Sequence, residues 1–118
     1  MNEQATEIRR RTRELGLRVI RLVRSLPRDR VAEVIGKQLL RSATSVGANY
    51  RAACRARSAA EFRAKLGICE EEADESIYWI ELLVDAELIK RERVEDLLDE
   101  ANQLLSIIVA SIKTSRGN

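Results

Sequence analysis

The sequence predicts an all-α protein, an antiparallel up-and-down four-helix bundle without strands. Three observations indicate this fold: apolar residues recur at three- and four-residue steps in four stretches, strong helix formers dominate, and the 118 residues include 5 Gly and one Pro. The connections between these stretches are short, which makes neighbouring helices antiparallel. We expect a single domain over residues 1–118, with helices near 3–26, 29–57, 58–86 and 91–115.

The first helix, 3–26, has one apolar face and ends before Pro27, because proline disfavours helical geometry in the residue that precedes it. Asp29 is well placed to cap the helix that follows. The expected core positions of the first helix are Ile8, Thr12, Leu15, Val19, Leu22 and Leu26.

The second helix, 29–57, is expected to turn a small and partly polar face inward. This predicted face consists of Val31, Ile35, Gln38, Ser42, Val46, Asn49, Ala53 and Ala56. Close helix packing explains such a face if Ser42 and Asn49 form hydrogen bonds to neighbouring helices. A ligand pocket is the alternative.

The third helix, 58–86, begins at a capping box, in which Ser58 caps the helix and Glu61 reaches back to its start. Its expected core positions are Phe62, Leu66, Cys69, Ala73, Ser76, Ile77, Ile80 and Val84. No Gly or Pro marks the connection at 86–91. The fourth helix, 91–115, has acidic residues in its first turn, which suits the positive end of a helix dipole. Its expected core positions are Val94, Leu97, Leu98, Ala101, Leu104, Leu105, Ile108 and Ile112.

The residues needed for catalysis or metal binding are largely missing from the sequence. It contains no histidine and no Gly-rich phosphate loop, and Cys54 and Cys69 lack the spacing of a zinc motif. We therefore expect no enzyme activity, no catalytic residue, no metal and no cofactor. The N-terminal residues are polar, no apolar run is long enough for a membrane span, and only two cysteines occur. These features predict a cytoplasmic protein with no membrane partner.

The charges divide the chain into a basic and an acidic part. Residues 1–65 hold 16 Lys and Arg against 6 Asp and Glu, a net charge of +10, whereas residues 66–104 hold 3 against 13, a net charge of −10. Such asymmetry indicates either an anionic partner for the basic part or neutralisation of one helix pair by the other, within or between subunits.

Two stripes of basic residues, one on each of the first two helices, are candidates for nucleic-acid binding. They comprise Arg10, Arg13, Arg21, Arg24, Arg28, Lys37, Arg51 and Arg55. The planar guanidinium group binds phosphate through two hydrogen bonds, so an arginine row suits a phosphate backbone. Since aromatic residues are only 3% of the chain, we expect contact with the backbone of RNA or DNA and not base stacking. A solubilising face or salt bridges between subunits are the alternatives.

The third helix carries two further features. Ile68, Trp79 and Leu82 lie off its core face, and an apolar patch outside the core predicts an interface in a homo-oligomer. The acidic run at 70–75 is either a solvated face or a set of ion pairs. We expect a buried polar network, within one chain or across subunits, because buried charges need partners. Its members are Arg41, Ser42, Asn49, Glu72 and Glu75.

Several segments, in order along the chain, resemble a known family. They are Arg41–Ala53, then Ser58, Glu61, Phe62, Lys65, Glu72, Ala73, Glu75 and Tyr78–Leu83. This pattern resembles the bacterial four helix bundle protein family, whose members include proteins encoded in intervening sequences of large-subunit ribosomal RNA genes. The resemblance spans nearly the whole chain and is densest over residues 39–83. It implies a bundle that assembles into a ring, typically a homopentamer, and it implies no established biochemical activity.

A more distant branch is similar to the accessory variability determinant of diversity-generating retroelements, a basic pentamer that binds nucleic acid and a reverse transcriptase. We therefore expect a non-enzymatic homo-oligomer, pentameric by resemblance, that binds the phosphate backbone of RNA or DNA. The alternative is a protein–protein interaction scaffold with no nucleic-acid activity. The expected partners are further copies of the chain, together with RNA or DNA or a second protein.

Overall fold

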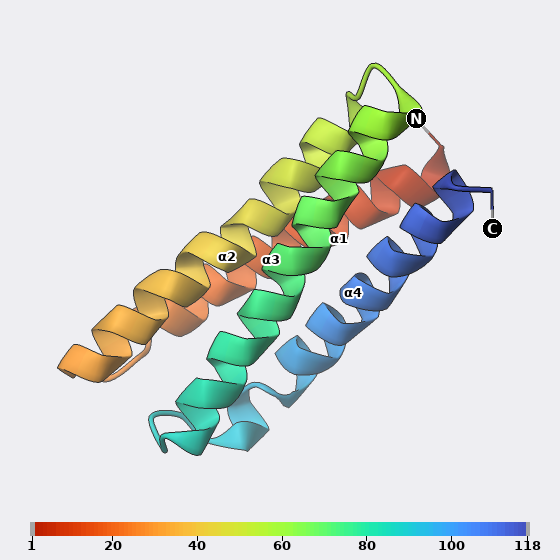
Figure 1. The fold of residues 1–118 in the computed structure, drawn as a ribbon. Coiled ribbons are helices and arrows are strands. Elements are labelled where there is room, and N and C mark those ends of the chain that lie inside the picture. The colour runs from red at the N-terminus through yellow and green to blue at the C-terminus, as the bar shows by residue number, and fades with distance from the viewer. Residues whose placement is uncertain (1, 118) are drawn as a thin grey trace.

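Four antiparallel helices form an up-and-down bundle in the structure, a computed structural model that describes residues 2–117 (Figure 1). The helices are α1 (Glu3–Arg24), α2 (Arg30–Cys54), α3 (Ala59–Asp85) and α4 (Glu95–Ser115), and a short 3₁₀ helix, η1 (Arg91–Arg93), precedes α4. Residues 2–117 contain no strand, so the predicted fold class is confirmed. The bundle measures 45 × 21 × 20 Å. No helix within the described range is long and apolar enough to cross a bilayer.

The starts of α2 and α3 are capped by side chains. Asp29 Oδ2 accepts a hydrogen bond of 3.0 Å from the backbone N–H of Ala32, as predicted. Ser58 Oγ accepts one of 3.1 Å from the N–H of Glu61. The predicted capping box differs in its second contact, because the Glu61 carboxylate accepts from the backbone N–H of Arg57, at 3.4 Å, and not from that of Ser58.

The connection between α3 and α4, which carries no Gly or Pro, closes through the backbone of Glu87. This residue has a φ of 63°, in the left-handed region. Its N–H donates to the Val84 carbonyl at 2.9 Å, and the N–H of Leu88 donates to the Leu83 carbonyl at 3.0 Å. These two bonds form a Schellman motif, which ends α3 and places Leu88 against the core beside buried Leu83. The fourth helix consequently begins at Glu95, after η1, and not at residue 91.

The core positions predicted for the first and fourth helices are confirmed. The predicted positions in α1 are buried, and Leu26, which follows α1, is half-buried against the core. Those in α4 and Val94 just before it are buried, except Leu105, which is half-buried against the core. On α3 the predicted positions are also buried, except Phe62 and Val84, which are half-buried, and Leu83 is an additional buried residue.

The predicted inward face of the second helix is wrong at two positions. Val31 is 53% exposed and Gln38 is exposed. The buried residues of α2 are Ala32, Ile35, Gly36, Leu39, Ser42, Ala43, Val46, Tyr50 and Ala53. The reason is that several buried positions of α2 are Ala or Gly, which carry little hydrophobic signal.

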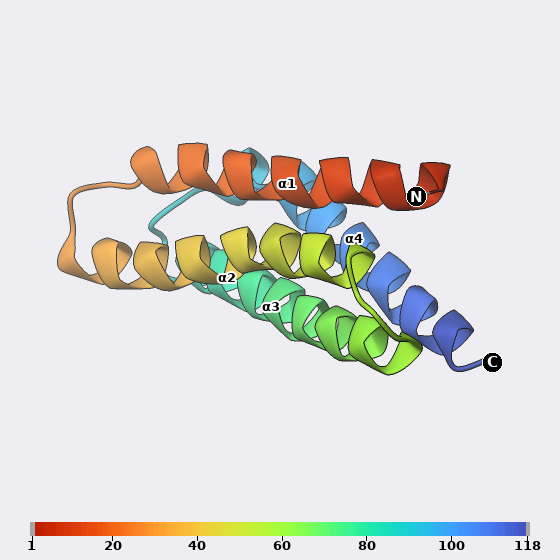
Figure 2. The same cartoon turned by 90° about the horizontal axis from the view of Figure 1, so that it is seen from above.

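Helices α1 and α4 contact each other much less than the other neighbouring pairs do. Figure 2 shows α4 diverging from α1 toward the end that holds both chain termini. A bidentate ion pair joins these two helices, since Arg11 Nε and Nη2 donate to the two carboxylate oxygens of Glu100 at 2.9 and 2.6 Å.

Candidate nucleic-acid interface

A shallow groove runs along the outer side of the contact between α1 and α2, where two glycines bring the helices together. A Cβ atom on Gly47 would stand 3.2 Å from the carbonyl oxygen of Thr12, and one on Gly16 would stand 3.7 Å from Thr44 Cα. We call this depression, with a volume of about 370 Å³, the α1/α2 groove. Its lining consists of Arg9, Thr12, Arg13, Gly16, Leu17, Ile20, Thr44, Gly47, Ala48 and Arg51.

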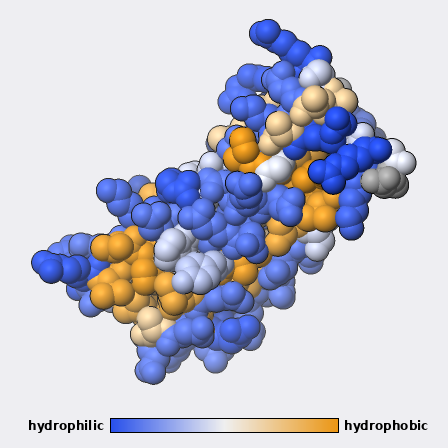
Figure 3. All heavy atoms as spheres, in the orientation of Figure 1, coloured by the Kyte–Doolittle hydropathy of each residue, from blue (hydrophilic) through white to orange (hydrophobic). Residues whose placement is uncertain are grey.

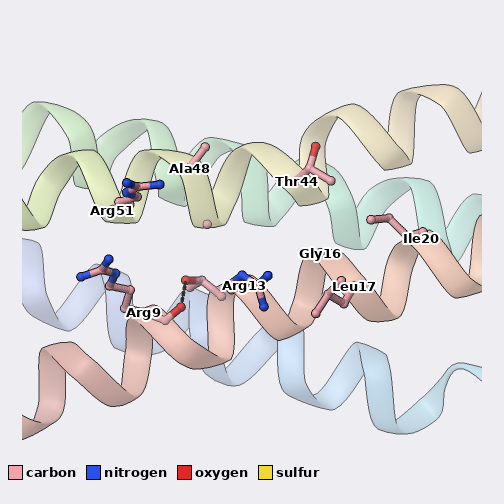
Figure 4. Close-up of a pocket in the computed structure, with 10 residues that line it drawn as sticks. Arg9, Arg13, Gly16, Leu17, Ile20, Thr44, Ala48 and Arg51 are labelled. Atoms are coloured by element: carbon pink, nitrogen blue, oxygen red, sulfur yellow. Dashed lines mark hydrogen bonds between the residues drawn. The ribbon is translucent and has the colours of Figure 1, made fainter.

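The arginines of the groove gather at one end of it. Figure 4 shows Arg9 of α1 and Arg51 of α2 facing each other across that end, with Arg13 between the two helices. Leu17 and Ile20 line the other end. The groove is therefore basic at one end and apolar at the other.

A second hollow, of about 430 Å³, adjoins the basic end and shares Ala48 and Arg51 with the groove. Its lining also includes Arg55, at the C-cap of α2, and Arg57, in the connection to α3. We use the term arginine cluster for four of the five arginines that line the two hollows, those on α1, on α2 and at the C-cap of α2. They are Arg9, Arg13, Arg51 and Arg55.

No member of the arginine cluster forms an ion pair with a residue in the range 2–117. Neighbouring arginines of α1 are different, since Arg10 lies 2.6 Å from a Glu7 carboxylate oxygen and Arg21 lies 3.6 Å from one of Glu14. The side chains of Arg13, Arg51 and Arg55 are exposed, and that of Arg9 is half-buried. The charges of the cluster thus remain available to an anion from outside.

The structure divides the eight basic residues that the sequence predicted as a nucleic-acid site. Three of them, Arg13, Arg51 and Arg55, belong to the arginine cluster, whereas Arg10 and Arg21 are paired with carboxylates of their own helix. The remaining three lie nearer the other end of this helix pair: Arg24 ends α1, Arg28 lies in the connection to α2, and Lys37 lies in the first half of α2. The last two of these line a separate hollow of about 340 Å³ together with Glu33.

Sequence reasoning missed Arg9, which is half-buried and lies nearer the core face than the predicted stripe. The signal that identifies it is its spacing of four residues from Arg13, which places both on one face of α1.

The predicted contact between the second and third helices is present within one chain. Arg41 Nη1 donates to Glu72 Oε2 at 2.8 Å, and Arg41 Nη2 donates to Glu75 Oε1 at 2.8 Å. The two carboxylates raise the pKa of Arg41, and Glu72 has the larger effect. Hydrogen bonds from the Arg41 guanidinium and, to a smaller extent, from the Trp79 indole lower the pKa of Glu75. The prediction that this group is buried is wrong for Arg41, whose side chain is 52% exposed because it reaches over the outside of α3.

The other members of the predicted polar network lie apart from this ion-pair group. The hydroxyl oxygens of Ser42 and Ser76 lie 2.9 Å apart, fully buried between α2 and α3. Asn49 joins neither group, because its Nδ2 donates to the Ser45 carbonyl one turn earlier on its own helix, at 2.9 Å.

The predicted oligomer interface corresponds to a mixed surface on α2 and α3. Trp79 and Leu82 are half-buried and pack partly on the core, and Ile68 is 38% exposed. The most exposed large apolar residues on α2 are Val31 and Val34, at 53% and 60%. Figure 3 shows a continuous hydrophobic area at the end of the molecule where α2 begins.

The contact of Arg41 with Glu75 fixes how α2 and α3 lie side by side. On α2, Val34 and Val31 lie about two and three turns before Arg41, and on α3, Trp79 and Leu82 lie about one and two turns after Glu75. In this antiparallel pair the four residues therefore continue toward the same end of the bundle. We call these four residues the α2/α3 apolar face. The sequence pattern missed Val31 and Val34 because it assigned the first to the core and left the second out.

The two thiols have no feature of a reactive site. Both cysteines are free, and burial raises the pKa of Cys69 to about 12 and also raises that of Cys54. A hollow of about 890 Å³ beside Cys54, where α1 and α4 diverge, is lined by no charged side chain. Neither thiol is activated as a thiolate, because burial raises the pKa of both.

Comparison with known proteins agrees with this fold. The family model described as 23S rRNA-intervening sequence protein matches residues 4–110. A crystal structure from Bacteroides thetaiotaomicron VPI-5482, described as a protein with unknown function from the S23 ribosomal protein family, is 36% identical in sequence, with a TM-score of 0.86. The match covers 92% of this chain and 97% of that one. A search of curated proteins returns no match. Since the family model spans most of the chain, this four-helix bundle belongs to the 23S rRNA-intervening sequence protein family.

Proposed function

We propose that this chain is a non-enzymatic, homo-oligomeric helical-bundle protein that binds the phosphate backbone of RNA or DNA at the arginine cluster. The observation that carries this proposal is the lack of any carboxylate partner for the four arginines within residues 2–117. Neighbouring guanidinium groups repel one another, and a phosphate between them replaces that repulsion by charge-assisted hydrogen bonds.

The spacing of the cluster suits a chain of phosphates better than a single small anion. Arg9 and Arg13 are four residues apart on α1, which is about 6 Å along its axis, and Arg55 follows Arg51 at the C-cap of α2. The two pairs therefore follow the length of the adjoining hollows on both sides.

The acidic part of the chain does not cancel this charge locally. No Asp or Glu lines the α1/α2 groove, and the second hollow has only Glu61. The most enclosed carboxylates of α3 and α4 already bind arginines elsewhere, Glu72 to Arg41 and Glu100 to Arg11.

Homo-oligomerisation is supported by the α2/α3 apolar face, since an exposed apolar area on a small protein usually marks an interface. The family resemblance implies five copies in a ring. A ring would repeat the arginine cluster around its axis, and several weak contacts to one nucleic-acid chain would then combine into useful affinity.

The test compares binding of labelled structured RNA and duplex DNA by wild type and two double variants at low salt. Arg13→Gln/Arg51→Gln removes two cluster charges, and Arg10→Gln/Arg21→Gln removes two charges that are already paired. We expect the first variant to lose about tenfold or more in affinity, because two charge-assisted hydrogen bonds to phosphate are lost. The second should retain nearly wild-type affinity.

Equal binding by the two variants would contradict the proposed site. A folded, oligomeric wild type that binds neither RNA nor DNA at low salt would contradict nucleic-acid binding altogether and favour a protein-interaction scaffold.

A further inference from the structure

We propose that the apolar end of the α1/α2 groove holds an unpaired nucleobase while the arginine cluster holds its phosphate, so that the protein prefers single-stranded over duplex nucleic acid. This inference rests on the proposed function and adds the structural class of the nucleic acid to it.

The polar groups at the apolar end are already used within the protein. Thr44 Oγ1 donates to the Leu40 carbonyl of its own helix at 2.7 Å, and Thr12 Oγ1 donates to the Arg9 carbonyl at 3.1 Å. The Thr44 methyl carbon lies 3.8 Å from the point where a Cβ of Gly16 would stand, so the methyl group is turned toward the groove. A ligand therefore meets mostly hydrocarbon at this end.

Three residues that line the groove have small side chains or none. They are Gly16, Gly47 and Ala48, and Leu17 and Ile20 also line the groove. A planar ring fits against these three residues without displacing side chains. The Arg13 guanidinium, between the helices, offers a flat surface, and guanidinium planes stack on bases.

The size of the groove restricts the ligand further. Its volume of about 370 Å³ is near the lower end of the usual range for ligand pockets, roughly 300–1,000 Å³. One nucleotide fits such a space. The arrangement of charge agrees, because a nucleotide has an anionic group at one end and, at the other, a flat ring whose faces can lie against hydrocarbon.

A base within a duplex cannot enter the groove, because it remains stacked and paired with its edges turned toward its partner. The apolar end therefore adds binding energy only for an unpaired nucleotide, whereas the arginine cluster serves both forms. No free polar side chain at the apolar end is available to read base edges, so the preference concerns strandedness and not sequence.

The test uses a labelled oligo-dT strand and a duplex of equal length at the same salt concentration. We expect wild type to bind the single strand about five- to tenfold more tightly than the duplex. Thr44→Leu narrows the apolar end without changing charge, and it should reduce single-strand affinity to the duplex level and change duplex affinity by less than twofold. Thr6→Leu, an exposed threonine on α1 away from the groove, is the matched control and should behave as wild type.

Circular dichroism and light scattering of each variant establish that fold and assembly are retained. Equal wild-type affinity for the two ligands, or an equal loss of affinity for both in Thr44→Leu, would overturn the single-strand preference. Binding of the duplex by wild type would still support the proposed function in that case. A wild type that binds neither ligand would refute both proposals together.

Discussion

Gly47 of α2 lies against the backbone of Thr12 of α1, so closely that a Cβ atom at position 47 would stand 3.2 Å from the Thr12 carbonyl oxygen. This approach brings Arg9 and Arg13 of α1 near Arg51 of α2 and leaves a hydrocarbon floor between the helices. The candidate site is thus a consequence of how two helices pack, and not of a separate loop or motif.

Replacement of the helical glycines by alanine should separate this packing role from helix propensity. Alanine stabilises a helix interior by about 1 kcal/mol relative to glycine. Gly67→Ala meets open space and Gly16→Ala meets Thr44 at an ordinary contact distance of 3.7 Å, so both should increase the free energy of unfolding by about that amount. Gly47→Ala should not increase the free energy of unfolding, because its methyl group would press on the backbone of α1. Denaturant unfolding checks the order, and a Gly47→Ala variant as stable as the other two would contradict it.

Glycine should be favoured at position 87. Glu87 has a left-handed backbone conformation, with a φ of 63°, in which a side chain is unfavourable. Glu87→Gly should therefore increase the free energy of unfolding by about 0.5–1 kcal/mol, whereas Glu87→Ala, which keeps a Cβ atom, should not. Thermal unfolding of the two variants provides the comparison. A Glu87→Gly variant less stable than Glu87→Ala would show that the side chain of Glu87 matters more than its backbone.

The ion pair between Arg11 and Glu100 should make stability depend on pH. The Arg11 guanidinium lowers the pKa of Glu100 below its ordinary value of 4.5, since it favours the ionised carboxylate in the folded state. The resulting stabilisation is fully present above pH 4.5 and is lost as the pH falls through the folded-state pKa. Glu100→Gln should cost about 1–2 kcal/mol at pH 7, because it weakens a hydrogen-bonded, largely enclosed pair.

The measurement is denaturant unfolding of wild type and Glu100→Gln at several pH values. The difference between the two proteins should shrink below pH 4.5. Glu7→Gln, which disrupts the exposed pair with Arg10, serves as the control and should have a smaller effect at pH 7. If the difference in unfolding free energy between wild type and Glu100→Gln stayed constant down to pH 3, the Arg11–Glu100 ion pair would not be the source of the pH dependence.

The α2/α3 apolar face should control assembly. Val34 is 60% exposed, so Val34→Glu places a charge in this face without disturbing the core. Light scattering should show wild type as an oligomer and Val34→Glu shifted toward the monomer, because burying the new charge in an interface is unfavourable. Ser106→Glu, on the exposed side of α4, adds the same charge elsewhere and should remain oligomeric. A wild type that is already monomeric at micromolar concentration would refute the oligomer.

The sequence predicts best where large aliphatic residues mark the buried face of a helix. Helices α1 and α4 have a single apolar face, and their predicted core positions are buried or half-buried. The bonds from Arg41 to Glu72 and Glu75 were also predictable, since helices two and three had to be antiparallel neighbours with opposite charges at that height.

Prediction from the sequence failed where tertiary packing decides. Helix α2 is covered on two sides, and glycine and alanine make the contacts with α1, so a hydropathy pattern does not show its true buried face. The turn at Glu87 depends on Leu88 returning to the core and has no Gly signal. The site itself depends on the rotation of α1 against α2, which decides that Arg9 faces Arg51 while Arg10 remains with Glu7.

Phosphate binding by the arginine cluster is tested most directly by the salt dependence of nucleic-acid affinity. The logarithm of the binding constant for duplex DNA should fall linearly with the logarithm of the salt concentration, with a slope of about −0.9 for each phosphate neutralised. Arg9→Gln/Arg51→Gln should make this slope less negative by about 1.8, because two phosphate contacts are lost. Arg24→Gln/Arg28→Gln, at the end of α1 and in the connection to α2, should leave the slope unchanged. Identical slopes for wild type and the cluster variant would contradict phosphate binding by the arginine cluster.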